Sequence, residues 1–267
     1  MFFINVNPVI SIGPISIRWY GVMVTLGILV LVLWLLREAR KGANLSYDTV
    51  LTAAIVGIPS GIVVSRLLHV IDQWGYYVQH PAEIIGAGGL TIYGAILGAA
   101  LGIWIYGRFS RKFRFGYLAD LLVPGLILAQ AIGRVGCILN GCCYGFETDI
   151  FCAIIYTNPE SYGPIGIPVH PTQLYEIVYL LIVFGVLLSI RRRFKPDGSL
   201  FLIYLSLYSL WRIGIDFIRD GTPFLFGLHQ AQVIGIIILA ITVPLLAYRT
   251  RWVKSRDSTG DSTLPAK

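Results

Sequence analysis

The residues best suited to chemistry are five arginines that stand in or beside apolar segments otherwise almost without charge. A cation inside a hydrocarbon layer costs about 2.5–3.5 kcal/mol on insertion scales, so by default it marks a functional site. Arginine presents a planar fork of N–H groups that suits phosphate or carboxylate, and no lysine accompanies these five. The pattern predicts a site for an anionic ligand. The five residues are Arg18, Arg66, Arg134, Arg212 and Arg219.

Arg134 lies in a glycine-rich stretch, Gly133–Gly145, which follows the apolar run Leu121–Ile132. Four of its thirteen residues are glycine. An interior glycine costs a helix about 1 kcal/mol relative to alanine, which is unexpected for a helix that only spans lipid. Glycine also lets the backbone approach a ligand or another helix closely. We therefore expect part of the binding site here.

A second group lies at helical spacing near the C-terminal third of the chain. Tyr208, Arg212, Asp216 and Arg219 are separated by four, four and three residues, so they share one helix face. One interpretation is an internal ion-pair ladder that lets the helix cross the bilayer, because intramembrane charges usually pair. The other is that one arginine stays available for a ligand anion.

The segment His170–Glu176 opens a further apolar run. Thr172 is predicted to cap this helix, with Glu176 one turn later. Glu176 enters the membrane without a local partner, so we expect one of the five arginines to be its counter-ion.

Two tyrosines stand at the same predicted membrane face. Tyr20 follows Arg18 and Trp19, where an aromatic belt would also place it. Tyr93 lies in the segment Gly89–Gly98, whose small residues recur every four positions and favour helix packing. Either tyrosine could instead face a cavity.

The four cysteines allow three interpretations. Cys152 could form a disulfide with Cys142 or Cys143, or the thiols could simply pack. A zinc site that includes His170 comes second, because the spacing matches no common pattern. A nucleophilic thiol comes third, since no histidine is adjacent. No metal or cofactor is predicted.

Composition places these residues in a membrane protein. Hydrophobic residues make up 56% of the 267 and charged residues 13%, against about 25% charged in soluble domains. The net charge of +7 does not indicate nucleic-acid binding, because the basic residues come in short clusters between apolar runs. The start, Met1–Ile17, lacks the basic region and cleavage site of a signal peptide.

The predicted architecture is an all-α polytopic fold with seven membrane helices. A span needs about 20 mostly apolar residues, and breaks at Pro59 and Pro124 are tolerated where neighbouring helices satisfy the backbone. The predicted spans are Trp19–Leu36, Val50–Ile71, Leu90–Tyr106, Ala119–Cys137, Gln173–Ile190, Leu200–Ile215 and Gln230–Ala247.

Loop charges orient this architecture. Sixteen of the 21 basic residues follow the first, third, fifth and seventh predicted helices, which makes that side cytoplasmic. The N-terminus is then outside, the C-terminus inside, and the five arginines lie near the outer face. We expect one membrane domain over residues 1–252 that includes an outer cap at about 145–169, and a polar, disordered cytoplasmic tail at 253–267. The sixteen basic residues are Arg37, Arg40, Lys41, Arg108, Arg111, Lys112, Arg114, Arg191, Arg192, Arg193, Lys195, Arg249, Arg251, Lys254, Arg256 and Lys267.

Taken together, the segments resemble the bacterial prolipoprotein diacylglyceryl transferase family. The family signature, Gly-Arg-x-Gly-Asn-Phe-x-Asn-x-Glu-x-x-Gly, corresponds to Gly133–Gly145. This sequence departs from the family at Cys137 and Cys142, which replace the signature asparagine and glutamate, and at Tyr93, which replaces a histidine. The other matching segments are Arg18–Gly21, Ser65–Leu67, His170–Glu176 and the Tyr208/Arg212/Asp216/Arg219 stripe.

The resemblance implies transfer of a diacylglyceryl group from phosphatidylglycerol to the lipobox cysteine of a secreted prolipoprotein at the bacterial inner membrane. A thioether forms and glycerol 1-phosphate leaves. The implied partners are phosphatidylglycerol, the prolipoprotein signal peptide and membrane lipids, with no nucleic acid. The implied catalytic residues are Arg134, Arg212, Tyr93 and Tyr20. The implied substrate-binding residues are Arg134, Asn140, Gly145, Arg66, Tyr208, Asp216, Arg219 and Glu176.

Two other functions would use the same residues. A transporter for an anionic solute would need a polar path through the inner half of the helices, where only Asp120 and Arg66 are candidates. A divergent paralogue could bind lipid or move a different lipid group. No nucleotide-binding loop, serine-hydrolase elbow or zinc-protease motif is present, which disfavours those classes.

Overall fold

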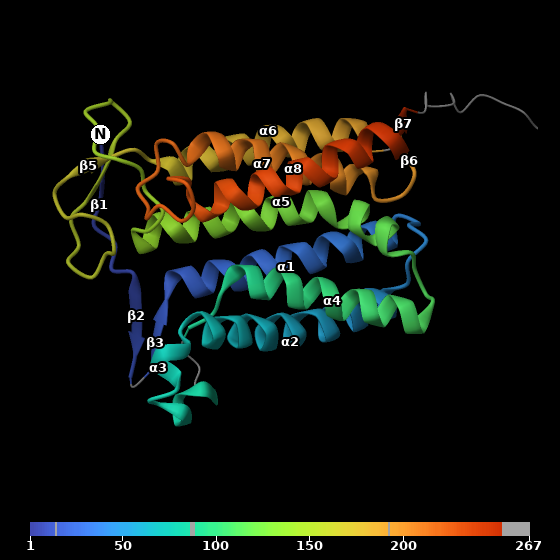
Figure 1. The fold of residues 1–267 in the computed structure, drawn as a ribbon, viewed down its shortest axis with the longest axis horizontal. Helices are drawn as coiled ribbons and strands as arrows, with labels where there is room; N and C mark the ends of the chain where they lie inside the picture. Colours follow the sequence, from blue (N-terminus) through green and yellow to red (C-terminus); the bar gives the residue numbers. More distant parts are fainter. Residues whose placement is uncertain (14, 86–88, 192, 253–267) are drawn as a thin grey trace, which may run out of the picture. The chain divides into compact units, whose positions relative to one another are not determined.

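The computed structural model describes residues 1–13, 15–85, 89–191 and 193–252, and it is mainly helical (Figure 1). Each of the seven predicted spans coincides with one of its helices. The helices are α1 (Trp19–Arg40), α2 (Tyr47–Asp72), α3 (Trp74–Tyr77), the 3-10 helix η1 (Pro81–Ile85), α4 (Ile92–Ser110), α5 (Phe115–Asn140), α6 (Thr172–Ile190), α7 (Ser199–Ile215) and α8 (Gln230–Arg249). The strands are β1 (Phe2–Ile4), β2 (Val9–Ile12), β3 (Ile15–Arg18), β4 (Ile154–Tyr156), β5 (Pro168–Val169), β6 (Phe194–Lys195) and β7 (Arg251–Trp252).

Within the described residues, six helices are long and apolar enough to cross a membrane, namely α1, α2, α4, α5, α6 and α8. The remaining apolar helix, α7, has 17 residues. At 1.5 Å per residue it measures about 25 Å, against about 30 Å for a hydrocarbon core. The chain is therefore a polytopic membrane protein, while the seventh span stays a prediction that rests on this shorter helix.

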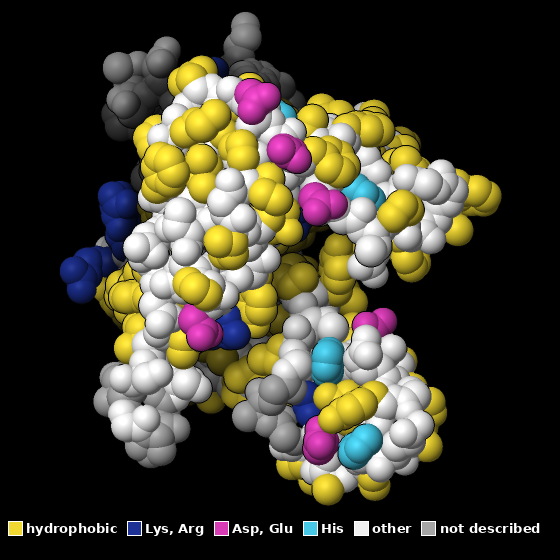
Figure 2. Space-filling model, turned by 90° about the vertical axis from the view of Figure 1, so that its left-hand side faces the viewer, with side chains coloured by type: hydrophobic (Ala, Val, Ile, Leu, Met, Phe, Trp, Pro, Cys, Tyr) yellow, Lys and Arg dark blue, Asp and Glu magenta, His cyan; other side chains and the backbone are white. Residues whose placement is uncertain are grey.

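Exposed hydrophobic side chains accompany these helices, as lipid-facing surfaces require. On α2 and α4, for example, Ile55, Val63 and Ile96 are each at least 60% exposed. Figure 2 looks onto one end of the helices rather than onto their sides, and there hydrophobic side chains lie among polar groups, with charged side chains only in small groups.

The chain divides into two compact units, one of Ile10–Gly136 and one of Met1–Val9 with Cys137–Lys267. In the first unit, α2 packs closely against α4 through glycines. A Cβ on Gly98 would lie 2.4 Å from the carbonyl oxygen of Ser60, and one on Gly94 would lie 2.5 Å from the Cα of Ser65. Ser65 Oγ donates to the Thr91 carbonyl at 2.7 Å. The predicted packing role of these small residues is confirmed.

Within the same unit, α1 packs closely against α5. Gly27 approaches the Ala129 carbonyl so closely that a Cβ would lie 2.9 Å from its oxygen. Trp34 Nε1 donates to the Leu121 carbonyl at 3.1 Å. α5 continues through Pro124, as the sequence predicts.

In the second unit, α7 packs against α6 and α8. Tyr179 OH on α6 donates to the Leu207 carbonyl at 2.7 Å. Gln232 Nε2 on α8 donates to the Ile213 carbonyl at 3.1 Å. α7 is thus hydrogen-bonded on two sides near the end that carries the predicted stripe.

The predicted outer cap contains a small sheet in the order β1-β4-β5. β1 pairs in parallel with β4, with Phe3 opposite Ile155, and β4 pairs antiparallel with β5. Ile154, Tyr156 and Val169 form its core. The sheet departs from the predicted all-α fold, because the N-terminal residues supply a strand. The predicted tail, 253–267, lies outside the described residues.

Candidate functional site

The predicted stripe on α7 forms an ion-pair network with α6. Arg212 Nη2 lies 2.9 Å from Asp216 Oδ1, one turn further along the chain. Arg212 Nη1 lies 3.9 Å from Glu176 Oε2 on α6, and Arg219 Nη1 lies 3.8 Å from Asp216 Oδ1. Tyr208 OH donates to Glu176 Oε1 at 3.1 Å. All five residues were predicted as site residues, and the structure brings them together.

The network is buried and its formal charges balance. The side chains of Glu176, Asp216 and Arg212 are 4%, 3% and 12% exposed. Two carboxylates face two guanidinium groups, so the predicted ladder exists and Glu176 has an arginine counter-ion as expected. The Nη1 atom of Arg212 is buried and makes no hydrogen bond within the described part of the chain. This nitrogen therefore keeps donor capacity for an anion.

The glycine-rich stretch ends α5 and turns back sharply. α5 runs to Asn140, three residues beyond the predicted end at Cys137. Gly141 and Cys143 then adopt positive φ angles of 71° and 67°. The N–H of Cys142 donates to the Cys137 carbonyl at 3.1 Å, which closes the turn. Positive φ is uncommon for a residue other than glycine, so Cys143 is held in place by its surroundings.

Gly145 joins this loop to the stripe by close backbone contact. It forms an isolated antiparallel bridge with Arg219, and its N–H donates to the His170 carbonyl at 2.9 Å. A Cβ at this position would lie 2.4 Å from the Ile218 carbonyl oxygen. Only glycine fits without displacing backbone, so Gly145 sets the distance between the loop and the end of the stripe.

The start of α6 holds the same loop from the other side. Gln173 Nε2 donates to the Cys142 carbonyl at 2.7 Å, and Thr172 Oγ1 donates to the Cys143 carbonyl. The predicted capping role of Thr172 is wrong. Pro171 occupies the cap position without a side-chain hydrogen bond, and the threonine hydroxyl is committed to the loop.

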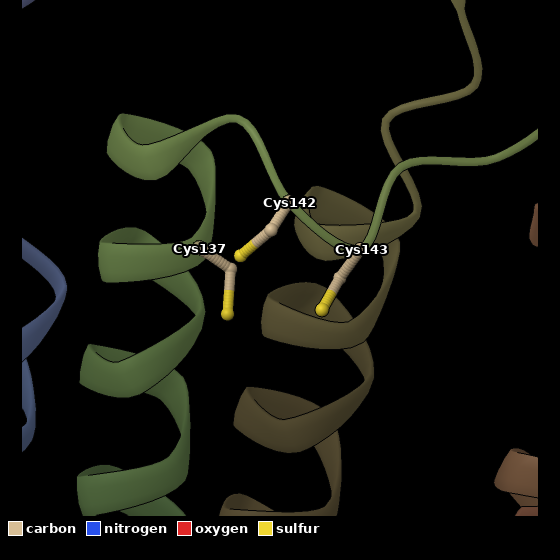
Figure 3. A group of neighbouring side chains, drawn as sticks. All are labelled: Cys137, Cys142 and Cys143. Atoms are coloured by element: carbon tan, nitrogen blue, oxygen red, sulfur yellow. The ribbon is translucent and has the colours of Figure 1, made fainter. Parts of the chain in front are cut away.

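None of the four cysteines, all of which the structure describes, forms a disulfide, so the predicted disulfide of Cys152 is not formed. Cys152 Sγ instead lies 3.8 Å from Tyr175 OH. The other three sulfur atoms lie within 4.8 Å of one another, and Figure 3 shows the side chain of Cys137 pointing from α5 toward the loop that carries Cys142 and Cys143. Contact with Cys137 lowers the pKa of the Cys142 thiol. Contact with Cys143 and burial together raise this pKa by more, so it lies above its ordinary value.

Asn140 lies at the base of the cysteine loop. Its side chain is buried, and Nδ2 donates to Cys142 Sγ at 3.6 Å. Its carbonyl accepts the N–H of Tyr162 at 3.2 Å. The residue therefore supports the turn, beside which Gly141 also approaches Ser161 closely.

In the unit Ile10–Gly136, Tyr20 and Arg134 lie where α1 begins and α5 nears its end. A Cβ on Gly136 would lie 2.9 Å from the Cβ of Met23 and 3.3 Å from the Cα of Tyr20, so glycine lets the two helices meet there. Arg134 precedes Gly136 by two residues and is half-buried. Tyr93 lies in the first turn of α4, and it is 36% exposed.

Arg66 has a structural task in the same unit. Its Nε donates to the Ile84 carbonyl and its Nη1 to the Gly89 carbonyl, both at 3.0 Å, and Nη2 donates to the Glu83 carbonyl. The guanidinium also lies over the ring of Tyr77, 5.2 Å from the centroid. Arg66 thus binds two carbonyls of η1 and that of Gly89, and its predicted contact with substrate stays a prediction.

Two cavities open beside these residues in the second unit. One, of about 460 Å³, is apolar and is lined partly by Tyr179, Leu210, Trp211 and Ile215. Its lining on α7 includes Trp211, which directly precedes Arg212 in the chain, but not Arg212 itself. The other, of about 370 Å³, borders the cysteine loop and is lined by Gly141, Cys142, Cys143, Tyr144, Tyr162, Asp220, Gly221 and Thr222.

Sequence reasoning missed two residues. Gln173 is buried, and besides the Cys142 carbonyl its Nε2 reaches Tyr156 OH at 3.2 Å. A glutamine inside an apolar run was the available signal. Trp211 stacks on Tyr179 with ring centroids 4.3 Å apart, and its buried Nε1 has no hydrogen-bond partner among the described residues. Its position beside Arg212 was the only signal, because tryptophan is common in membrane helices.

The fold and this site define a polytopic membrane protein with a buried arginine–carboxylate network beside an apolar cavity. The family model described as prolipoprotein diacylglyceryl transferase matches residues 7–248. The chain therefore belongs to that family, and it is a transferase of lipoprotein biosynthesis.

Curated relatives agree over nearly the whole chain. A protein from Dehalococcoides mccartyi named phosphatidylglycerol–prolipoprotein diacylglyceryl transferase is 54% identical over 258 residues, which cover 96% of this chain and 99% of the relative. A protein of the same name from Symbiobacterium thermophilum is 39% identical, with 96% and 97% covered. One from Clostridium perfringens, named as transferase 2, is 36% identical, with 94% and 97% covered. These relatives do not favour the transporter alternative.

Proposed function

We propose that this chain transfers the diacylglyceryl group of phosphatidylglycerol to the thiol of a lipobox cysteine in a secreted prolipoprotein. The observation that carries the proposal is the family match over residues 7–248. The buried network around Arg212 and the adjacent apolar cavity support it, because a phospholipid donor needs both a cationic contact and an apolar one.

The proposed reaction is a displacement at the glycerol carbon that bears the phosphate ester. The cysteine thiol loses its proton, since the thiolate is the nucleophile. The C–S bond forms, the C–O bond to phosphate breaks, and the bonding electron pair leaves with the phosphate oxygen. Glycerol 1-phosphate departs and a thioether remains, so negative charge grows on the leaving phosphate.

Arg134 and Arg212 are the proposed phosphate ligands. Cationic donors that are already oriented stabilise the charge that develops on a leaving phosphate. The buried Nη1 of Arg212, which lacks a hydrogen bond in the described structure, supports its role. Asp216 and Arg219 orient Arg212, and Tyr208 fixes Glu176 on its other side.

The apolar cavity is the proposed place for an acyl chain. Its 460 Å³ is lined by aromatic and aliphatic side chains from α6 and from the part of α7 that also carries Arg212. Trp211, which stacks on Tyr179, belongs to this lining and would pack against the acyl chain. Asn140 and Gly145 shape the neighbouring loop.

Proton removal from the thiol is assigned to tyrosine and to the positive field of the arginines. Tyr20 and Tyr93 are the second residues of α1 and α4, which begin at Trp19 and Ile92. The positive field of the arginines would lower the pKa of the substrate thiol, and a tyrosine hydroxyl would pass the released proton on to water.

The proposed topology has seven spans in the cytoplasmic membrane, with the N-terminus outside and the C-terminus inside. The basic ends of α1 and α4 support it, because Arg37, Arg40 and Arg108 all lie in last helical turns. The outer cap, with its sheet of β1, β4 and β5, would then receive the prolipoprotein from the outer face.

The test is a transfer assay with purified protein, phosphatidylglycerol vesicles and a lipobox peptide. We expect a diacylglyceryl peptide by mass spectrometry from the wild type and none from Arg134→Ala. Arg108→Ala, at the end of α4, is the matched control and should retain activity. If the wild type yields no thioether with a suitable lipid, the transferase proposal fails, and solute flux into liposomes would then favour the transporter alternative.

A further inference from the structure

The cysteine loop brings three thiols to one point. The sulfur atoms of Cys137, Cys142 and Cys143 lie within 4.8 Å of one another. Cys137 is buried, whereas Cys142 and Cys143 are partly exposed toward the cavity of about 370 Å³. Figure 3 shows all three side chains around one small space beside the end of α5. The proposed transfer reaction assigns no role to any of the three thiols.

The local backbone is built to hold the three sulfurs in place. Cys143 adopts a positive φ of 67°, a conformation that costs a residue other than glycine about 1–3 kcal/mol. Gly141 makes the turn before it possible at φ 71°. Thr172 and Gln173 bind the carbonyls of Cys143 and Cys142 from outside the loop. These contacts fix the backbone from which the side chains of Cys142 and Cys143 project.

We propose that Cys137, Cys142 and Cys143 form a binding site for a thiophilic divalent metal ion, with Zn²⁺ as the ion that fits best. Three thiolates at Zn–S distances of about 2.3 Å in a tetrahedral site stand about 3.8 Å apart. The present separations lie within 4.8 Å, so they exceed that value by about 1 Å at most. Sulfur ligands select Zn²⁺ over Mg²⁺ or Ca²⁺, which prefer oxygen.

The surroundings supply the rest of a metal site. Asn140 Nδ2 donates to Cys142 Sγ at 3.6 Å, a contact that stabilises a thiolate. The cavity provides an entry path, and three protein ligands leave the fourth position open for water, as in zinc sites that bind exchangeable ligands. Cys152 lies apart, beside Tyr175, and is not a ligand.

The experiment measures Zn²⁺ and Co²⁺ binding to the full chain, purified in detergent without a histidine tag and reduced before use. We expect one Zn²⁺ per chain in competition with a chromophoric chelator. Co²⁺ should give thiolate-to-metal charge-transfer absorption. Cys137→Ser, Cys142→Ser and Cys143→Ser should each weaken binding by about tenfold or more. Cys152→Ser, which removes one thiol elsewhere, should bind as the wild type does.

A folding control keeps the test decisive. Zn²⁺ should raise the melting temperature of the wild type and of Cys152→Ser, but not that of Cys142→Ser, whose partly exposed side chain can change without opening the core. Absence of stoichiometric binding to the reduced wild type would overturn the proposal. So would equal binding by the cluster variants and the wild type, or charge-transfer bands that survive all three substitutions.

Discussion

Replacing Arg212 with glutamine tests how the buried network is held together. The change removes the cation that lies 2.9 Å from Asp216 and 3.9 Å from Glu176. Both carboxylates are less than 5% exposed, so water cannot replace the lost partner. Removing one partner of a buried ion pair costs about 3–5 kcal/mol, and Arg219, 3.8 Å from Asp216, offsets only part of that. We expect Arg212→Gln to lose about 3 kcal/mol of unfolding free energy.

The double variant Arg212→Gln/Asp216→Asn separates charge burial from other effects. It removes one carboxylate together with the cation, so the formal charges of the network balance again. We expect it to recover about 1–3 kcal/mol relative to the sum of the single changes, the coupling usual for residues in one network. Transfer activity should stay lost, because the phosphate ligand is still missing.

The assay is reversible unfolding in mixed micelles, paired with the transfer assay on the same preparations. Arg108→Gln is the control, since Arg108 is exposed at the end of α4 and should change stability by less than about 0.5 kcal/mol. If Arg212→Gln unfolds like the control, the ion pairs do not stabilise the fold. If the double variant regains activity, Arg212 is a structural residue and not a phosphate ligand.

Three further predictions concern the packing and the thiols. Gly145→Ala should lose about 1–3 kcal/mol of unfolding free energy and most activity, because its Cβ would lie 2.4 Å from the Ile218 carbonyl; wild-type stability would contradict this. Gly98→Ala, with a Cβ 2.4 Å from the Ser60 carbonyl, should lower the melting temperature, and an unchanged value would refute the close packing of α2 on α4. Alkylation of Cys142 in metal-free protein should be slower at pH 7 than alkylation of a free cysteine, because only the thiolate reacts and the pKa of Cys142 is raised. The alkylation rate should increase as the pH approaches that raised pKa. A rate at pH 7 above that of free cysteine would contradict the raised pKa.

The helices were predictable because their signal is local and strong. A run of about 20 apolar residues has few alternatives to a membrane helix, so each predicted span coincides with a helix. The stripe was predictable for the same reason, since spacing alone puts Arg212 and Asp216 on one face. That Glu176 would pair with an arginine followed from the cost of an isolated buried charge.

Other features depend on contacts that sequence does not display. β1 pairs with β4 about 150 residues away, and three-residue strands carry too little periodicity to predict. Thr172 has the residue type and the position of a helix cap. In the fold its hydroxyl instead donates to the Cys143 carbonyl, which would otherwise lack that donor. The predicted disulfide between Cys152 and Cys142 or Cys143 rests only on the oxidising chemistry of the outer side. The fold instead places Cys152 beside Tyr175.

The most direct test of the transferase proposal follows both products of one reaction. Phosphatidylglycerol labelled in its terminal glycerol is incubated with the purified protein and a lipobox peptide. We predict that labelled glycerol phosphate and unlabelled diacylglyceryl peptide appear in equimolar amounts, and that both disappear when the peptide cysteine is replaced by serine. Release of label without peptide modification, or no release at all, would contradict the account.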